Sequence, residues 1–163
     1  MNAIRTHRSG LEPKPTVLYI EDDNGNRQAF HAAFRRDFNV VLASNAAQAW
    51  AALESQEIHV VVADQRMPDL QGSHLLHDIR LRYPMVRRML VTGYADIQAV
   101  IDAVNLGGVS HYIAKPWDPS EVLHAVHDSF EDYMKEKERN DQTERLQEAN
   151  RQLEFALRQQ LLS

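Results

Sequence analysis

Short runs of apolar, mostly β-branched residues recur along the chain and are separated by longer stretches with a different periodicity. Five of these runs have the length of a strand, at 16–20, 39–43, 59–64, 88–92 and 110–114. The third run is continuously apolar from Val60 until it stops at Asp64. This is typical of a strand that is buried on both faces of a parallel sheet. The runs therefore predict five β-strands.

The stretches between the runs predict helices, because their apolar residues recur with helical spacing. Ser44 or Asn45 can cap the second of these helices, and the third ends before Pro84. The sides expected to be buried carry Ala29, Phe30, Ala33 and Phe34; Ala49, Trp50 and Leu53; Leu75, Leu76 and Ile79; and Ile97, Val100, Ile101 and Val104. Strands that alternate with helices in this way predict an α/β fold, with one doubly wound parallel sheet covered on both faces.

The last part of the chain has the pattern of a long helix. Asp118 is a favourable cap, with Pro119 at the first helical position and Glu121 at the third. From Ser120 to Ser163 there is no Gly or Pro, so a continuous helix of these 44 residues would extend about 66 Å. Asn140–Thr143 is a weak helical patch, and a separate helix could start at Asp141. The stripe expected to face the domain carries Val122, Leu123, Val126, Phe130 and Tyr133.

Beyond Met134 the helix carries a short heptad pattern. Position a is taken by Thr143, Asn150 and Leu157, and position d by Leu146, Leu153 and Gln160. An Asn at position a selects register in parallel dimers, so we expect a homodimer through a short coiled coil. A four-helix bundle, docking of a partner and a single solvated helix are the alternatives. Self-association is favoured because the leucines and Phe155 form too large an apolar surface to leave exposed.

Composition excludes several classes of protein. Cysteine is absent, so disulfides, thiolate zinc sites and thiol nucleophiles are excluded. Apolar runs are too short to cross a membrane, and residues 1–15, which we interpret as a flexible leader, lack the core of a signal peptide. We therefore expect a cytoplasmic protein. Two i, i+3 histidine pairs, His74/His77 and His124/His127, could ligate zinc, but we interpret them as solvated helix faces.

Charge argues against nucleic acid as a direct partner. The chain has a net charge of −5, and the segment from Asp118 to Ser163 holds 11 acidic and 6 basic residues, which is also a net −5. This acidic tail would repel a phosphate backbone.

Polar residues follow four of the five predicted strands. Glu21 and Asp22 follow the first strand, Asp64 ends the third, and Thr92 and Lys115 stand at the ends of the fourth and fifth. These ends converge on one edge of a doubly wound sheet, where ligands bind. Three carboxylates there would repel each other, and Mg²⁺ together with a lysine would relieve that repulsion. A carboxylate nucleophile assisted by a metal and a lysine suits phosphoryl transfer through an aspartyl phosphate.

These residues resemble the receiver domain of bacterial two-component response regulators, over residues 16 to about 134. The resemblance rests on the acidic pair, the sequence Asp64-x-x-Met67-Pro68-x-x-x-Gly72, Thr92 and Tyr112-x-x-Lys115-Pro116. It implies a flavodoxin-like sheet with strand order 2-1-3-4-5. It also implies that Asp64 is the phosphoacceptor and that Glu21, Asp22, Asp64 and the backbone carbonyl of Arg66 hold Mg²⁺.

Further roles are carried over by the same resemblance. Lys115 and Thr92 would contact the phosphoryl group, Thr92 and Tyr112 would switch the 92–115 face, and Lys115–Pro116 would be a cis peptide. Asp23 would occupy a third acidic position. The residues expected to flank the site are Arg66, Tyr94, Gly93 and Pro116, of which Arg66 and Tyr94 would tune the lifetime of the phosphoryl group.

The expected organisation is a leader at 1–15, a receiver domain at 16–134 and a helical extension at 135–163. A histidine kinase or phosphotransfer protein would donate the phosphoryl group, and the output partner is unknown. One alternative is the front end of a longer regulator with a cyclic-dinucleotide or kinase output domain. Another is a magnesium-dependent aspartyl-phosphate phosphatase, but such hydrolases need an acid two residues after the nucleophile, where this chain has Arg66.

Overall fold

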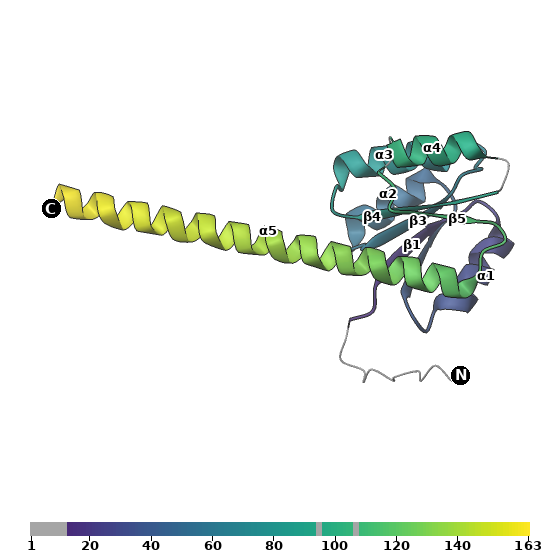
Figure 1. The fold of residues 1–163 in the computed structure, drawn as a ribbon, viewed down its shortest axis with the longest axis horizontal. Helices are drawn as coiled ribbons and strands as arrows, with labels where there is room; N and C mark the ends of the chain where they lie inside the picture. Colours follow the sequence, from purple (N-terminus) through teal and green to yellow (C-terminus); the bar gives the residue numbers. More distant parts are fainter. Residues whose placement is uncertain (1–12, 94–95, 106–107) are drawn as a thin grey trace.

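The computed structural model describes residues 13–93, 96–105 and 108–163, so most of the predicted leader lies outside the described residues. Strands and helices alternate along the chain (Figure 1). The strands are β1 (Thr16–Ile20), β2 (Asn39–Ala43), β3 (Val60–Asp64), β4 (Arg87–Thr92) and β5 (His111–Ala114). The helices are α1 (Asn24–Phe34), α2 (Ala46–Ser55), α3 (Gly72–Arg82), α4 (Ile97–Asn105) and α5 (Pro119–Leu162).

The strands form one parallel sheet in the order β2-β1-β3-β4-β5. This confirms the α/β prediction and the strand order that the family resemblance implies. Strand β3 lies at the centre of the sheet and is buried along its whole length. The carboxyl end of β3, where Asp64 stands, is therefore flanked by the ends of β1 and β4.

Two apolar clusters cover the two faces of the sheet. Successive side chains of a strand point to opposite faces, so Leu18 and Ile20 join one cluster while Val17 and Tyr19 join the other. Helices α2 and α3 and Ala103 of α4 complete the first cluster, and helices α1 and α5 complete the second. The sheet is thus covered on both faces, as the continuous apolar β3 run predicts.

The predicted buried side of α4 is partly wrong. Ile101 and Val104 are 46% and 53% exposed, whereas Ala99 and Ala103 are 9% and 0% exposed. Helix α4 therefore turns its alanines toward the sheet and toward α3. A spacing rule that ranks residues by hydrophobicity misses this arrangement, because small side chains let a helix approach its neighbours closely. In α1 the prediction is also partly wrong but in the opposite sense, because Phe30 and Phe34 are buried while Ala29 and Ala33 are exposed.

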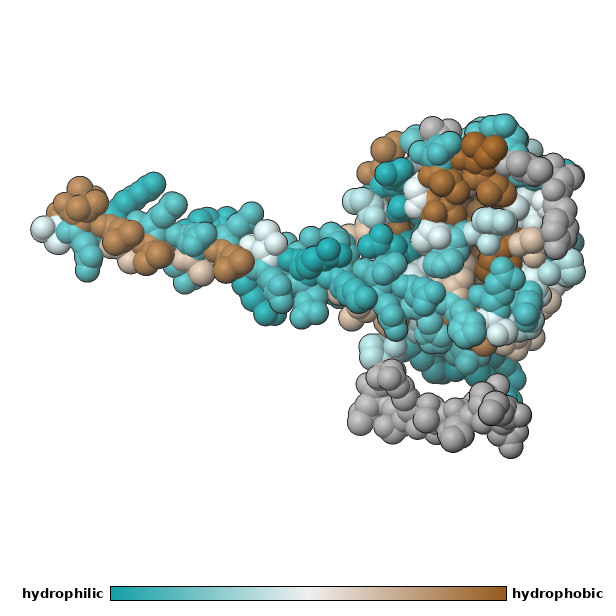
Figure 2. Space-filling model, in the orientation of Figure 1, coloured by the Kyte–Doolittle hydropathy of each residue, from teal (hydrophilic) through white to brown (hydrophobic). Residues whose placement is uncertain are grey.

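Helix α5 is one uninterrupted helix of 44 residues, so the predicted possible start of a separate helix at Asp141 is wrong. The Asp118 carboxylate accepts a hydrogen bond from the Ser120 amide at 3.0 Å, which confirms the predicted cap. The first half of α5 packs on the sheet, and every residue from Glu138 to Ser163 is exposed. Figure 2 shows the second half projecting from the domain with apolar side chains along one side.

Polar contacts hold α5 where it leaves the sheet. The Tyr133 hydroxyl donates to the Glu57 carboxylate at 3.0 Å, and Lys137 Nζ lies 3.2 Å from the same carboxylate. One turn later, Asn140 Nδ2 is 3.2 Å from the sulfur of Met85. Among the described helices, none is long and apolar enough to cross a membrane.

Candidate functional site

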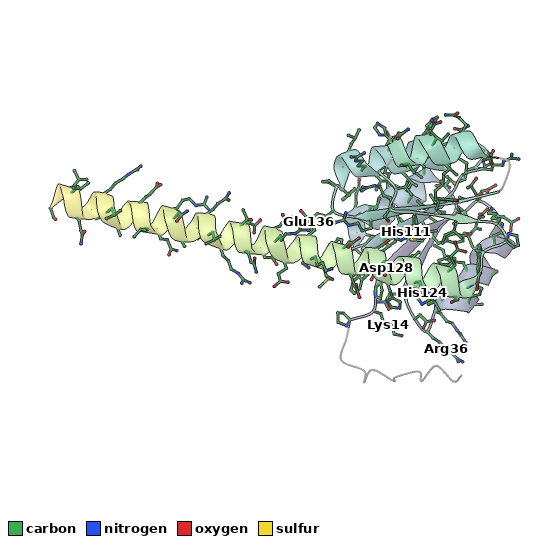
Figure 3. The ribbon with its side chains drawn as sticks, viewed as in Figure 1. Lys14, Arg36, His111, His124, Asp128 and Glu136 are labelled. Carbon is green, nitrogen blue, oxygen red and sulfur yellow. The ribbon has the colours of Figure 1, made fainter. Side chains whose placement is uncertain are left out.

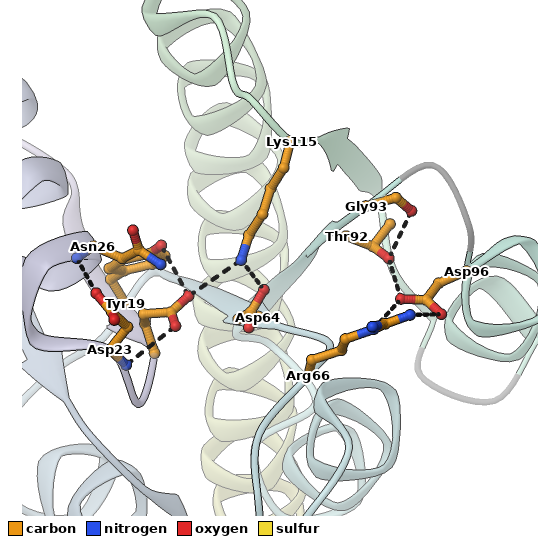
Figure 4. Close-up of polar contacts among 10 residues, drawn as sticks. Tyr19, Asp23, Asn26, Asp64, Arg66, Thr92, Gly93, Asp96 and Lys115 are labelled. Atoms are coloured by element: carbon orange, nitrogen blue, oxygen red, sulfur yellow. Dashed lines mark hydrogen bonds and ion pairs between the residues drawn. The ribbon is translucent and has the colours of Figure 1, made fainter.

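The residues predicted to carry the chemistry come together at the carboxyl edge of the sheet. The side chains of Glu21, Asp22 and Asp64 each offer a carboxylate oxygen within 4.8 Å of the others. Lys115 reaches into this cluster, with its Nζ 2.6 Å from Asp64 Oδ1 and 3.5 Å from Glu21 Oε2 (Figure 4). Because parallel strands end on the same side, residues far apart in the sequence form one site.

The Asp64 and Glu21 carboxylates of this cluster are costly to keep charged. Burial raises the pKa of Asp64, and the Lys115 ammonium offsets part of that rise. Burial and the charge of Asp64 raise the pKa of Glu21 in the same way. Burial alone would lower the pKa of Lys115, but its hydrogen bond and charge interaction with Asp64 raise it overall. One lysine faces three carboxylates, so a further positive charge would be electrostatically favourable in this cluster.

Arg27 orients the acidic loop, a role that the sequence did not reveal. Its guanidinium donates to the backbone carbonyls of Glu21 and Asp22, at 2.7 Å in both cases. Asp23 accepts a hydrogen bond from the Asn26 amide at 2.8 Å and caps α1. The carboxylate expected at the third acidic position is therefore engaged with the start of the helix. A basic residue one turn into the first helix is the only signal that the sequence offers for Arg27.

Close packing explains the glycine eight residues after Asp64. A Cβ built on Gly72 would lie 2.2 Å from the backbone oxygen of Asp64. The loop between them closes through the Gly72 amide, which donates to the Gln65 carbonyl at 3.1 Å, and the Ser73 amide, which donates to Gln65 Oε1 at 2.9 Å. Helix α3 thus starts directly against the end of β3.

A second set of contacts lies beside the acidic cluster. The Thr92 hydroxyl, buried at the end of β4, is 3.3 Å from the Gly93 carbonyl and 3.5 Å from Asp96 Oδ2. Arg66 binds Asp96 through two nitrogens, with Nε at 3.0 Å from Oδ2 and a terminal nitrogen at 3.3 Å from Oδ1. Figure 4 shows Asp96 between Thr92 and Arg66. Sequence reasoning missed Asp96.

The remaining residues that were predicted to switch or flank the site differ in where they lie and in how exposed they are. The Lys115–Pro116 peptide bond is cis, as the resemblance implies. Tyr112 lies on β5 with 55% of its side chain exposed, and Gly93 is exposed at the end of β4. Tyr94 lies outside the described residues.

Histidines do not assemble a metal site among the described residues. The only group of three metal-compatible side chains in that part of the chain is the acidic cluster. His124 lies on the outer side of α5, near His111 and Asp128 (Figure 3), and His127 packs edge-on against Phe38. His74, His124 and His127 are exposed on their helices, which agrees with the helix-face interpretation, whereas His77 is half-buried.

Comparisons with known proteins point to one family. A family model described as the response regulator receiver domain matches residues 17–127. The hydrogenase transcriptional regulatory protein HoxA of Cupriavidus necator is 34% identical over 120 residues, which are 74% of this chain and 25% of that protein. The DNA-binding transcriptional regulator NtrC of Proteus hauseri is 30% identical over 128 residues, or 78% of this chain and 27% of that protein. The chain thus spans about a quarter of the length of these relatives.

A solved structure agrees with the sequence comparisons. The signal receiver domain of an HD domain-containing protein from Pseudomonas fluorescens has a TM-score of 0.72 and 28% identity, and the match covers 76% of this chain and 99% of that one. The family model ends at residue 127, so the projecting half of α5 lies beyond it.

Proposed function

The chain belongs to the family of response regulator receiver domains, which are signalling switches, and from this we propose that Asp64 is its phosphoacceptor. A histidine kinase or phosphotransfer protein would donate the phosphoryl group in the cytoplasm. The observation that carries the proposal is the Asp64 carboxylate itself. It stands at the end of the central strand, next to two further carboxylates and 2.6 Å from Lys115.

In the proposed chemistry, the Asp64 carboxylate is the nucleophile and a phosphodonor supplies the phosphoryl group. A carboxylate oxygen attacks phosphorus, the bond from phosphorus to the donor breaks, and the donor leaves with the electron pair. With acetyl phosphate as donor, the leaving group is acetate. In the reverse direction of the switch, water attacks phosphorus, the bond to Asp64 breaks, and inorganic phosphate leaves while the carboxylate is restored.

We propose Mg²⁺ as the cofactor, held by Glu21, Asp22, Asp64 and the backbone carbonyl of Arg66. The donor set supports this choice, because Mg²⁺ prefers carboxylate and carbonyl oxygens. When bound, the ion would neutralise charge on the carboxylates and on the phosphoryl oxygens. Lys115 adds a positive charge 2.6 Å from the Asp64 carboxylate, so it would stabilise the transferred group.

The remaining site residues would read out and protect the phosphoryl group. Thr92 would donate its hydroxyl to a phosphoryl oxygen, and Tyr112 would respond at the 92–115 face. Gly93 and Pro116 flank the site without side-chain chemistry of their own. Arg66 and Tyr94 would shield the aspartyl phosphate from water, so replacing both with alanine should shorten its half-life.

Labelling with acetyl phosphate tests the phosphoacceptor. The wild type should gain one phosphoryl group in Mg²⁺ and none in EDTA, and Asp64→Asn should abolish labelling while the circular dichroism spectrum stays the same. Asp69→Asn is the matched control, because Asp69 is an exposed acid in the same loop. Labelling that persists in Asp64→Asn, or that proceeds fully in EDTA, contradicts the proposal.

We further propose that residues 16–134 form the receiver domain and that the extension at 135–163 associates as a parallel homodimer. Leu146, Leu153 and Leu157 are 66%, 60% and 52% exposed. At about 100° per residue, this stripe lies roughly 140° around α5 from the face that packs on the sheet. Two helices could therefore pair through the stripe while each receiver domain stays on the outside, which supports a dimer without a clash between domains.

Sedimentation of stripe variants tests the dimer. Leu→Ala at a buried site costs about 2–5 kcal/mol, and a dimer loses this at both copies, so Leu153→Ala should be monomeric at micromolar concentration. Phe155→Ala is the matched control, since Phe155 is equally exposed at 65% but lies on another side of the helix. Asn150→Leu should strengthen association and mix registers, because the polar pair no longer penalises misalignment.

A sedimentation result can also exclude the dimer. A wild type that is monomeric with and without phosphorylation would contradict it and favour a different partner for α5. The relatives HoxA and NtrC are about three times as long as this chain. Their length supports one such arrangement, in which α5 connects the receiver to an output domain.

A further inference from the structure

Asp96 binds two of the groups that would contact a phosphoryl group on Asp64. Its Oδ2 atom lies 3.5 Å from the Thr92 hydroxyl and 3.0 Å from Arg66 Nε, and Oδ1 lies 3.3 Å from a second Arg66 nitrogen (Figure 4). The Arg66 guanidinium lowers the pKa of the Asp96 carboxyl, which keeps the carboxylate charged. One carboxylate therefore holds a hydroxyl from β4 and a cation from the loop after β3.

The same two donors are suited to phosphate. A phosphoryl group carries close to two negative charges and three acceptor oxygens at neutral pH. The Thr92 hydroxyl has one proton and can donate it to only one acceptor at a time. Arg66 favours whichever planar or charged acceptor is nearer, and arginine binds carboxylate and phosphate with similar geometry. A phosphoryl group on Asp64 would thus compete with Asp96 for Arg66, and with Asp96 and the Gly93 carbonyl for the Thr92 proton.

A cavity gives Arg66 a route between the two acceptors. The space of ≈ 360 Å³ beside the site has Arg66, Asp96 and Asp22 among its lining residues. The Arg66 side chain is 76% exposed, so no packing opposes its rotation. Rotation away from Asp96 would bring the guanidinium toward the acidic cluster.

Release of Asp96 would act on α4. The Asp96 carbonyl accepts the Val100 amide at 3.2 Å, and the Asp96 amide donates to the Gly93 carbonyl at 3.2 Å, so Asp96 joins the end of β4 to the first turn of α4. Helix α4 rests on the core through the small side chains of Ala99 and Ala103. Its position is therefore sensitive to the contacts at its start.

We propose that Asp96 is a positioning residue that takes the place of the phosphoryl group in the unphosphorylated protein. It holds Thr92 and Arg66 until phosphorylation of Asp64 withdraws both, which frees the start of α4. This inference rests on the proposed phosphorylation of Asp64. It assigns the coupling between the site and α4 to a carboxylate outside the acidic cluster.

Hydrogen exchange of the α4 amides at 100–105 tests this role in the full chain. In the unphosphorylated protein, Asp96→Asn should exchange about two- to fivefold faster than wild type, the effect expected for an exposed ion pair. Asn caps helices as well as Asp does, so loss of capping would not explain the change. Asp96→Glu should restore slow exchange. Glu54→Gln, which breaks the exposed Arg82–Glu54 pair between α3 and α2, is the matched control and should leave α4 unchanged.

Combined variants identify the donors through which Asp96 acts. If Asp96 works by holding Arg66 and Thr92, Asp96→Asn should have little further effect in a protein that already carries Arg66→Met and Thr92→Ala. Phosphorylation with acetyl phosphate should accelerate α4 exchange in the wild type and hardly at all in Asp96→Asn. Equal resting exchange in wild type and Asp96→Asn, or full additivity with the donor variants, would overturn the inference.

The resting-state measurement needs no phosphodonor, so it separates the two proposals. If Asp64 is not labelled but Asp96→Asn alters the exchange of α4, the phosphoacceptor assignment is wrong. The proposed coupling between phosphorylation and α4 is then wrong as well. Normal labelling at Asp64 with unaltered exchange would remove only the role of Asp96.

Discussion

Replacing Gly72 with alanine should damage both the stability of the domain and the position of Asp64. The new Cβ would lie 2.2 Å from the Asp64 carbonyl oxygen and 2.8 Å from the carbonyl carbon, both backbone atoms. Real Cβ atoms essentially never approach within 3.0 Å, so in a packed interior the two backbones must separate by at least about 0.8 Å. A flexible side chain could move aside, whereas the end of the central strand cannot.

Two opposing effects set the magnitude. Overpacking costs about 1–3 kcal/mol, and the rigid neighbour places Gly72→Ala at the upper end. Alanine also lowers the conformational entropy of the unfolded chain, which stabilises the folded state by about 0.4–1 kcal/mol. The net loss should be about 2 kcal/mol, or a fall in Tm of roughly 5–10 °C. Because a misplacement near 1 Å can cost a hundredfold in rate, labelling of Asp64 should slow by about tenfold or more.

Urea unfolding followed by fluorescence measures the stability, since Trp50 and Trp117 both pack on the domain. Gly93→Ala is the matched control, because a Cβ there meets nothing within 4 Å. Its stability should stay within about 0.5 kcal/mol of wild type. If Gly72→Ala is as stable as Gly93→Ala and labels at the wild-type rate, the close-packing argument is wrong.

Three further predictions concern charge and the docking of α5. Asp64→Asn should raise stability at pH 7 without divalent ions, because burial raises the pKa of Asp64 and its charged form destabilises the fold. The stability that the protonated Asp64 contributes is present below its unfolded pKa and is lost as pH rises through its folded pKa. In urea melts, the extra stability of Asp64→Asn over wild type should therefore vanish near pH 4. Lys115→Met should leave Asp64 and Glu21 without their ammonium, so it should lower stability at pH 7 more than at pH 4 and slow labelling. Tyr133→Phe should cost about 0.5–1.5 kcal/mol by removing the hydrogen bond to Glu57. Burial, together with this hydrogen bond, raises the pKa of Tyr133 to about 12. Unchanged urea midpoints would contradict the prediction.

The local pattern of the chain determined the elements and the edge on which the site forms. Apolar runs, caps and turn residues act over a few positions, so strand β3, the Asp118 cap and the end of α3 before Pro84 could be read directly. Parallel strands end on one side, and therefore Glu21, Asp22, Asp64 and Lys115 could be expected to meet. The heptad leucines were equally visible, because a heptad pattern depends only on spacing along the chain.

Tertiary structure decided which side of each helix is buried and which additional residues contact the site. Helix α4 packs through Ala99 and Ala103 rather than its larger residues, because the space left by α3 and the sheet sets that contact. Asp96 meets Arg66, which is 30 residues away along the chain, only after the loops that follow β3 and β4 come together. The need for Gly72 is also tertiary, since its Cβ would collide with a strand end eight residues away. Such contacts depend on distances in space between segments whose spacing along the chain carries no signal of them.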